Sequence, residues 1–313
     1  MNFQITFLLI ILIALIIDVL IGEFPAKMHP VVLMGKIIDI LKKYLINYRS
    51  KISGITLSLV MLITFTLATY VLISLSALTY ISYILVSSII LTTTFAIKVL
   101  LSSADSIRKD LNNDIDTARK NMSYLVSRDT KELTSEEIVS ATIETLTENI
   151  TDSVTAPLFY AFIFGVPGAV AYRVVNTLDA MVGYKKPETI DIGWFPAKFD
   201  DILNYLPARI TGILVVIAAL FLRMDWRNSY KIMIRDARNP DSPNSGYSMA
   251  AAAGALGIKL KKIGYYEIGD DLNSLTTDKI SEALRLSKVT IVLFLILATI
   301  IYEIIILFIF NFI

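Results

Sequence analysis

The sequence predicts an all-α protein, a polytopic bundle of membrane helices with amphipathic cytoplasmic helices and segments that are either short spans or re-entrant. Hydrophobic residues make up 55% of the chain and charged residues only 18%, and the mean hydropathy is positive. An ordinary soluble domain has about 45–50% apolar residues. The composition is therefore typical of an integral membrane protein, and long apolar stretches point to the same class.

Four stretches are long and apolar enough for a helix of about 20 residues to cross a bilayer. They are residues 3–21, 54–73, 78–100 and 289–311. Two shorter stretches, 154–171 and 207–222, contain or begin with proline, so each is either a span or a re-entrant segment. We expect residues 1–313 to form one membrane-embedded domain with a helical cytoplasmic loop at 101–153.

The distribution of Lys and Arg predicts the orientation. If both shorter stretches span, the segments richest in basic residues, 22–53, 101–153 and 223–288, fall on one side, which would be the cytoplasm. Two re-entrant stretches would return 173–207 to that side as well, and the sequence leaves both arrangements open. We expect a multi-pass protein of the cell membrane with its active site on the cytoplasmic side.

The loop at 101–153 has apolar residues at helical spacing and contains neither proline nor glycine. This pattern predicts two amphipathic helices joined around "SRDTKELT". Thr134 and Glu137 have the spacing of a capping box at the start of the second helix. Most acidic residues of the loop are expected to lie on a solvated helical face.

Composition also excludes several kinds of site. The formal net charge of +1 gives no sign of a nucleic-acid partner, and the chain has no cysteine. Disulfides, thiolate metal sites and cysteine nucleophiles are therefore excluded. His29 is the one histidine, so a histidine-cluster metal site is excluded too. A base or a substrate ligand is one interpretation of His29, although a histidine before a proline more often caps or packs.

The stretch "ETLTENITDSVTAPLFYAF" places acids directly before an apolar run. Glu144, Glu148 and Asp152 are four residues apart and share one face of a helix. They would repel one another unless a cation, a basic residue or a substrate amine lay among them. A solvated face is the alternative, but these acids end where the membrane begins.

Two later blocks are also polar at the ends of apolar segments. In "YRVVNTLDAMVGYKKPE", Arg173, Asn176 and Asp179 recur every three residues on one helix stripe, and Gly183 ends that helix before Lys185. A cluster that reaches for lipid headgroups is the alternative interpretation. Asp201 follows in "FDDILNYLPARITG".

In "PNSGYSMAAAAGALG", Asn244, Ser245 and Gly246 precede a helix of small residues. The start of a helix presents free N–H groups and a positive dipole end, so these residues are candidates for binding phosphate. A plain capped turn before a tightly packed helix is the alternative.

These motifs, in this order, resemble the adenosylcobinamide-phosphate synthase family of cobalamin biosynthesis, CobD/CbiB. The resemblance runs from about residue 15 to 290 and rests on "HPVVLMG", "SRDT", "IETLTENITDSVTAPLFY", "GVPGAVAYRVVNTLDAMVGYK", "FDDILNYLPARITG" and "PNSGYSMAAAAGALGIKL". It implies an ATP-dependent ligase that joins aminopropanol, or its phosphate, to a propionate carboxylate of adenosylcobyric acid. ATP and Mg²⁺ are implied with it, and no permanently bound cofactor. The implied partners are the lipid bilayer and other membrane enzymes of late cobalamin assembly.

The resemblance also suggests roles for the candidate residues. Glu144, Glu148 and Asp152 would be Mg²⁺ ligands or bases for the amine, with His29 as a further catalytic candidate. The candidates for binding substrate are Asn149, Arg173, Asn176, Asp179, Lys185, Asp201, Asn244, Ser245 and Gly246. Arg173 and Lys185 would neutralise phosphate oxygens, and the three asparagines would hold the amide-rich edge of the corrin ring. The rival interpretation is a membrane transporter, or a non-catalytic membrane partner, for a corrinoid.

Overall fold

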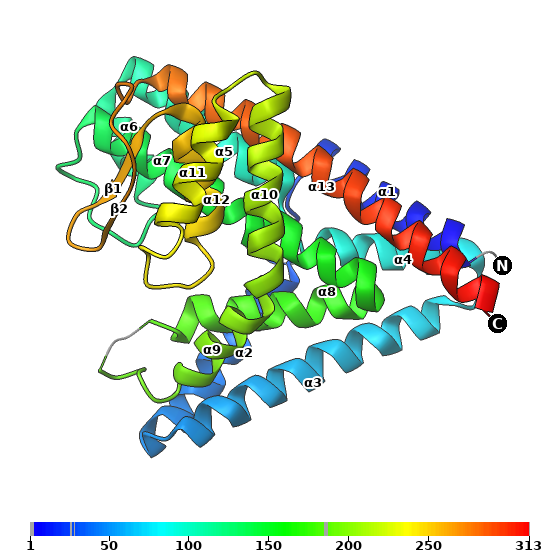
Figure 1. Cartoon of the computed structure of the whole chain (residues 1–313). Helices are drawn as coiled ribbons and strands as arrows, with labels where there is room; N and C mark the ends of the chain where they lie inside the picture. The colour runs from blue at the N-terminus through cyan, green and yellow to red at the C-terminus, as the bar shows by residue number, and fades with distance from the viewer. Residues whose placement is uncertain (1–2, 26, 28, 185–186, 313) are drawn as a thin grey trace. The chain divides into compact units, whose positions relative to one another are not determined.

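The computed structural model describes residues 3–25, 27, 29–184 and 187–312. These residues are mostly helical, with one two-stranded sheet (Figure 1), which confirms the predicted fold class. The chain divides into two compact units. The first unit comprises Met1–Lys98, Ala156–Leu203 and Ala298–Ile313, and the second comprises Val99–Thr155 and Asn204–Leu297. Each unit is described by itself.

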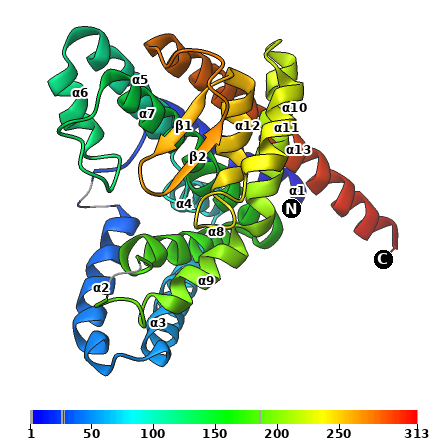
Figure 2. The same ribbon diagram turned by 60° about the vertical axis from the view of Figure 1, so that its left-hand side comes forward.

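The first unit is built around α8. Its elements are α1 (Phe3–Leu20), α2 (Pro30–Leu45), the short helix η1 (Ile46–Tyr48), α3 (Lys51–Ser76), α4 (Tyr80–Thr92), α8 (Ala156–Val182), α9 (Trp194–Leu203) and the last part of α13 (Thr277–Phe312). Helix α8 packs against α2, α3, α4 and α9, and Figure 2 shows α2, α3, α8 and α9 side by side. Leu57 and Met61 of α3 meet Val174 and Leu178 of α8 in its core.

The second unit is built around α12. Its elements are most of α5 (Ile97–Asn113), α6 (Ile115–Met122), α7 (Ser135–Ile150), the π-helical turn η2 (Thr151–Thr155), α10 (Tyr205–Phe221), α11 (Trp226–Asp236), α12 (Gly246–Leu256), β1 (Lys259–Lys262), β2 (Tyr266–Gly269) and the first part of α13. Helix α12 packs against α7, α10 and α11. Strands β1 and β2 are antiparallel, with Leu260 opposite Ile268.

The glycines of α12 allow neighbouring main chain to approach closely. A Cβ atom on Gly254 would lie 2.6 Å from the carbonyl oxygen of Asn228, and one on Gly246 would lie 2.1 Å from that of Ala237. Four alanines, 250–253, precede Gly254, and every residue of α12 except Tyr247 is buried. The small residues therefore let α11 pack directly against α12, as they do where membrane helices meet.

The candidate membrane spans fall on the predicted apolar stretches. Four helices are long and apolar enough to cross a membrane, among the residues described: Lys51–Ser76, Tyr80–Asn113, Ser135–Val182 and Thr277–Phe308. Helices α9 and α10 pass the same test only as one broken span. The stretch predicted at 3–21 is helical, but its described part, Gln4–Leu20, is a shorter apolar helix. The weak stretch at 154–171 lies inside the long helical run that ends at Val182.

The polar loop at 101–153 has three helices where two were predicted. The carboxylate of Asp114 accepts hydrogen bonds from the N–H groups of Asp116 and Thr117, so it begins a new helix, α6, and splits the first predicted one. The capping box at Thr134 and Glu137 is confirmed, with both reciprocal hydrogen bonds present at the start of α7.

Asp236 joins the end of α11 to β2. Its buried carboxylate accepts hydrogen bonds from Nε and Nη2 of Arg235, both at 2.7 Å, and from the N–H of Gly269 at 2.8 Å. Burial alone would raise the pKa of Asp236, but the hydrogen bonds from Arg235 and Gly269 outweigh burial and lower that pKa. The ionised carboxylate is therefore the form that stabilises this junction.

Candidate functional site

Helix α7 carries a pair of acidic residues into the second unit. Glu144 and Glu148 lie one turn apart, and the side chain of Glu144 is only 5% exposed. Nη2 of Arg128 donates a hydrogen bond of 3.0 Å to Oε1 of Glu144. Arg128 comes from the segment between α6 and α7, so a loop residue supplies a basic partner, one of the three alternatives that the sequence left open.

The pair is only partly satisfied. Oε2 of Glu144 and Nε of Arg128 are buried without a hydrogen-bond partner among the described residues. The carboxylate of Glu148 forms no hydrogen bond or ion pair with any described side chain. The negative charge of Glu144 repels its ionised form. Because most buried polar atoms in proteins have a partner, two such atoms beside the half-buried, unpaired carboxylate of Glu148 indicate a site for a polar ligand.

The β-hairpin completes this cluster. The positive charge of Lys262, at the end of β1, acts on both carboxylates. Burial, and then the charges of Glu144 and Glu148, raise the pKa of Tyr266 on β2. The Tyr266 hydroxyl therefore stays protonated at neutral pH; it donates to Sδ of Met249 at 3.9 Å and interacts with the carboxylate of Glu144. We call Arg128, Glu144, Glu148, Lys262 and Tyr266 the acid-pair cluster.

Asp152 does not complete a metal site with these acids. No group of three or more Asp, Glu or His side chains suited to holding a metal ion occurs in the described parts of the chain. The α-helix changes to the π-helical turn Thr151–Thr155 just where Asp152 lies, so the four-residue spacing no longer describes its direction. The described residues thus do not assemble the predicted three-carboxylate Mg²⁺ site. The Asn149 amide donates to the carbonyl of Thr145 on its own helix.

The predicted stripe on α8 forms a second cluster, within the first unit. Nε of Arg173 donates to the carbonyl of Thr94 at 2.7 Å, and Nη1 donates to Oδ1 of Asn176 at 3.0 Å. Asn176 in turn donates to Asp200 of α9 at 3.4 Å. The spacing of three therefore predicted the Arg173–Asn176 contact correctly, and Asp200 joins it. Asp201 pairs with Lys198 on its own helix.

Asp179 lies one turn beyond Asn176 in α8. Its carboxylate forms no hydrogen bond or ion pair with a described residue, and the charges of Asp200 and Asp201 act on it. A Cβ atom on Gly183 would lie 2.0 Å from Oδ1 of Asp179, so glycine leaves the room that this carboxylate occupies. Lys185, predicted to follow this helix end, lies outside the described residues.

His29 caps α2. Its Nδ1 accepts a hydrogen bond of 3.2 Å from the N–H of Val31. Burial lowers the pKa of His29; the charge of Glu23 opposes this effect and that of Arg173 adds to it. In the neutral ring the proton then sits on Nε2, which makes that atom a donor. This tautomer favours capping and substrate binding over the role of a general base.

The start of α12 has the arrangement predicted for it, with one addition. Ser245 is the N-cap residue, and its side chain makes no capping hydrogen bond. Nη1 of Arg209 donates to Oδ1 of Asn244 at 3.0 Å. The guanidinium of Arg209 also lies over the rings of Tyr205 and Tyr247, 3.4 and 4.4 Å from their centroids. Phosphate binding at this helix start stays a prediction, and Arg209 is the cation that would assist it.

Comparison with known proteins identifies the family. The family model described as "CobD/Cbib protein" matches residues 11–287. A "Probable cobalamin biosynthesis protein CobD" of Methanothermobacter thermautotrophicus is 51% identical over 285 residues, 91% of this chain and 94% of the relative. The "Cobalamin biosynthesis protein CobD" of Dehalococcoides mccartyi is 39% identical, over 89% of this chain and 92% of the relative. No solved structure matches the chain significantly. The chain therefore belongs to the CobD/CbiB family, as its motifs predicted, and is a cobalamin biosynthesis enzyme.

Proposed function

We propose that this enzyme forms an amide between a primary amine, aminopropanol or its phosphate, and a propionate carboxylate of adenosylcobyric acid, with ATP as the co-substrate. Membership of a cobalamin biosynthesis family supports the corrinoid substrate. The observation that carries the proposal is the acid-pair cluster, where a buried oxygen of Glu144 and the carboxylate of Glu148 lack partners among the described residues.

The reaction defines what such a site must do. A carboxylate and an amine at neutral pH form a salt, because the amine is protonated and the carboxylate is a poor acyl donor. Transfer of the γ-phosphoryl group of ATP to the carboxylate gives an acyl phosphate and ADP. The free amine then attacks the acyl carbon, and phosphate leaves with the former carboxylate oxygen. The enzyme must therefore bind an ammonium group, remove a proton from it and hold phosphate oxygens.

The acid-pair cluster suits the ammonium. Glu148 would accept the proton that the amine loses, and Oε2 of Glu144 would accept a hydrogen bond from the same nitrogen. Arg128 would hold Glu144 ionised and oriented through its 3.0 Å contact. Tyr266 would donate a hydrogen bond, since its pKa is raised. General base catalysis of this kind contributes about 10²- to 10⁴-fold to a rate.

Magnesium enters the proposal only together with ATP. The described residues form no cluster of three ligands for it. A Mg²⁺ ion usually keeps several waters and binds one or two carboxylates plus substrate phosphates, so a dedicated protein cage is not required. When bound, it would shield the charge of the phosphates. We assign no step of the reaction to it.

The test compares two substitutions on one helix. Full-length protein in detergent is given adenosylcobyric acid, ATP and either amine, and the amide product is measured by mass spectrometry. Glu148→Gln should lower turnover about 10²-fold or more because the base is lost. Glu136→Gln is the matched control, since Glu136 is exposed in the first turn of α7. Equal turnover in both variants would remove Glu148 from the site. Transport of the corrinoid across liposomes without any amide product would replace the ligase by a transporter.

A further inference from the structure

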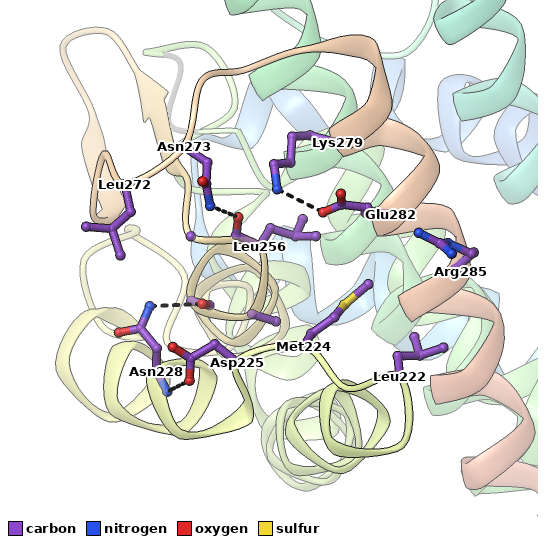
Figure 3. Close-up of a pocket in the computed structure, with 13 residues that line it drawn as sticks. Leu222, Met224, Asp225, Asn228, Leu256, Leu272, Asn273, Lys279, Glu282 and Arg285 are labelled. Atoms are coloured by element: carbon purple, nitrogen blue, oxygen red, sulfur yellow. Dashed lines mark hydrogen bonds and ion pairs between the residues drawn. The ribbon is translucent and has the colours of Figure 1, made fainter.

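The second unit has a cavity of about 370 Å³ away from the acid-pair cluster (Figure 3). It lies where α10 ends, α11 begins and α12 ends, and the first turns of α13 form its remaining wall. The proposed ligation does not use it.

The wall of this cavity is fixed by side chains that bind main chain. Asn228 donates to the carbonyl of Gly254 at 2.9 Å, and Asn273 donates to that of Leu256 at 3.0 Å. Nζ of Lys279 pairs with Glu282 at 2.9 Å, so that acid is neutralised. These contacts make the cavity a built feature of the fold.

The rim carries cations without partners. Arg285, which lines the cavity, is exposed and forms no hydrogen bond or ion pair with a described residue (Figure 3). Two more exposed cations lie outside the lining but next to it in the chain: Lys288, one turn after Arg285 in α13, and Arg223, between the lining residues Leu222 and Met224. Neither forms a hydrogen bond or ion pair with a described residue. Asp225 is the one unneutralised acid of the lining, and its carboxylate accepts the N–H of Asn228 as the cap of α11. The rim therefore attracts an anion.

The cavity also lies where two apolar helices meet polar chain. Helix α10 ends at Phe221, and α13 is mostly apolar from residue 289 onward, with Glu303 as its one charged residue there. Val289 of α13 packs against the core cluster that holds Ala218 of α10, so the two helices are neighbours at this level. Trp226, the exposed first residue of α11, comes soon after the end of α10. Tryptophan beside Lys and Arg at the end of an apolar helix is typical of the membrane–water interface.

We propose that this cavity and its rim of Arg223, Arg285 and Lys288 bind the phosphate headgroup of an anionic membrane lipid. The headgroup phosphate lies against Arg285, and the acyl chains follow the exposed apolar surface of Phe221 and Val292. Basic residues at a membrane surface are each attracted to anionic lipid, and the attraction weakens as salt increases. A free phosphate has the same charged group but no acyl chain.

The test is a lipid titration of the full-length protein in an uncharged detergent. Dioleoylphosphatidylglycerol, dioleoylphosphatidylcholine and inorganic phosphate are added separately, and the thermal unfolding midpoint and the lipid retained in native mass spectra are recorded. The anionic lipid should raise the midpoint saturably, and the other two should not at equal concentration. Arg285→Gln with Lys288→Gln should weaken the anionic lipid about 25-fold, from about fivefold for each charge. Arg238→Gln is the control, because Arg238 is equally exposed but lies beyond the far end of α11.

Each alternative result has a defined meaning. The substituted residues Arg238, Arg285 and Lys288 are all exposed. Without lipid, the unfolding midpoint of each variant should therefore equal that of the wild type. An unchanged affinity for the anionic lipid in the double variant would overturn the proposal. A midpoint raised as much by inorganic phosphate would assign the site to a free anion, and an equal effect of phosphatidylcholine would mean that no anionic headgroup is recognised.

Discussion

Replacing Arg128 by methionine should destabilise the second unit, although Arg128 lies in a loop. The substitution removes the hydrogen bond from Nη2 to Glu144 and leaves a carboxylate that is 5% exposed beside that of Glu148. Loss of a charge-assisted hydrogen bond costs about 1.5–3 kcal/mol. Removing one partner of a fully buried pair costs about 3–5 kcal/mol. Because the side chain of Arg128 is 21% exposed, we expect the lower of these two ranges to apply, with the free energy of unfolding falling by about 2 kcal/mol.

A double-mutant cycle isolates the pair from the packing of the arginine. The free energy of reversible unfolding in mixed detergent micelles at pH 7 is measured for three variants: Arg128→Met, Glu144→Gln and the double variant. The double variant should be more stable than the sum of the single effects predicts, by about 1.5–3 kcal/mol. The control pair is Lys261 and Glu267, which are 3.0 Å apart but 56% and 50% exposed. Exposed pairs of this kind couple by about 0.2–1 kcal/mol. A coupling for Arg128 and Glu144 no larger than that of the control would refute the buried pair.

Three further outcomes are expected. A cysteine placed at Ser135, in a chain with none, should not react with an impermeant reagent outside intact cells; labelling from outside would reverse the proposed cytoplasmic orientation. Asp236→Asn should lower the free energy of unfolding by about 1.5–3 kcal/mol at pH 7, and this difference should begin to shrink as pH falls below about 4, the ordinary carboxyl value. The folded-state pKa of Asp236 is lowered, so its contribution is complete above the ordinary carboxyl pKa and is lost as pH falls through the lower folded-state pKa; a difference as large at pH 2 as at pH 7 would contradict this. Arg173→Lys keeps the charge but loses the fork that reaches Thr94 and Asn176; if Arg173 binds a phosphate oxygen of a substrate, amide formation should fall about 10- to 100-fold, and unchanged kinetics for ATP and the amine would remove Arg173 from the candidates for binding substrate.

Most of the fold could be predicted from the sequence because a bilayer demands long apolar helices. A short polar element gives no such long apolar signal, and this explains why the β-hairpin was missed. The hairpin "KLKKIGYYEIG" alternates apolar and charged residues, with Leu260 and Ile268 facing the core and Gly264 at positive φ in its turn. That pattern is a strand signal, but it covers only two strands of four residues within a long polar segment. Without it, neither Lys262 nor Tyr266 could be placed beside the acids.

Local spacing predicted the contacts that arise within one helix and failed where tertiary structure intervenes. Arg173 and Asn176 are three residues apart in α8 and bind each other, as their spacing requires. Glu144 and Asp152 are eight apart, and the π-helical turn at Thr151–Thr155 changes the relation between them. A short-range rule thus assumes an unbroken α-helix, and any insertion into its hydrogen-bond ladder removes the basis of the rule.

The acid pair depends on a contact that helix periodicity could not supply. Two carboxylates one turn apart on a buried helix face are unfavourable alone, so the fold has to bring positive charge from elsewhere. The sequence allowed that inference but not its source, because Arg128 is 16 residues from Glu144 and reaches it only when the loop before α7 folds back. The arginine binds one oxygen of Glu144 and leaves the other without a hydrogen-bond partner among the described residues, and Glu148 pairs with no described side chain. An ion pair built only for stability would be expected to satisfy both oxygens. The incomplete pairing is therefore the feature that favours a ligand site over a structural salt bridge.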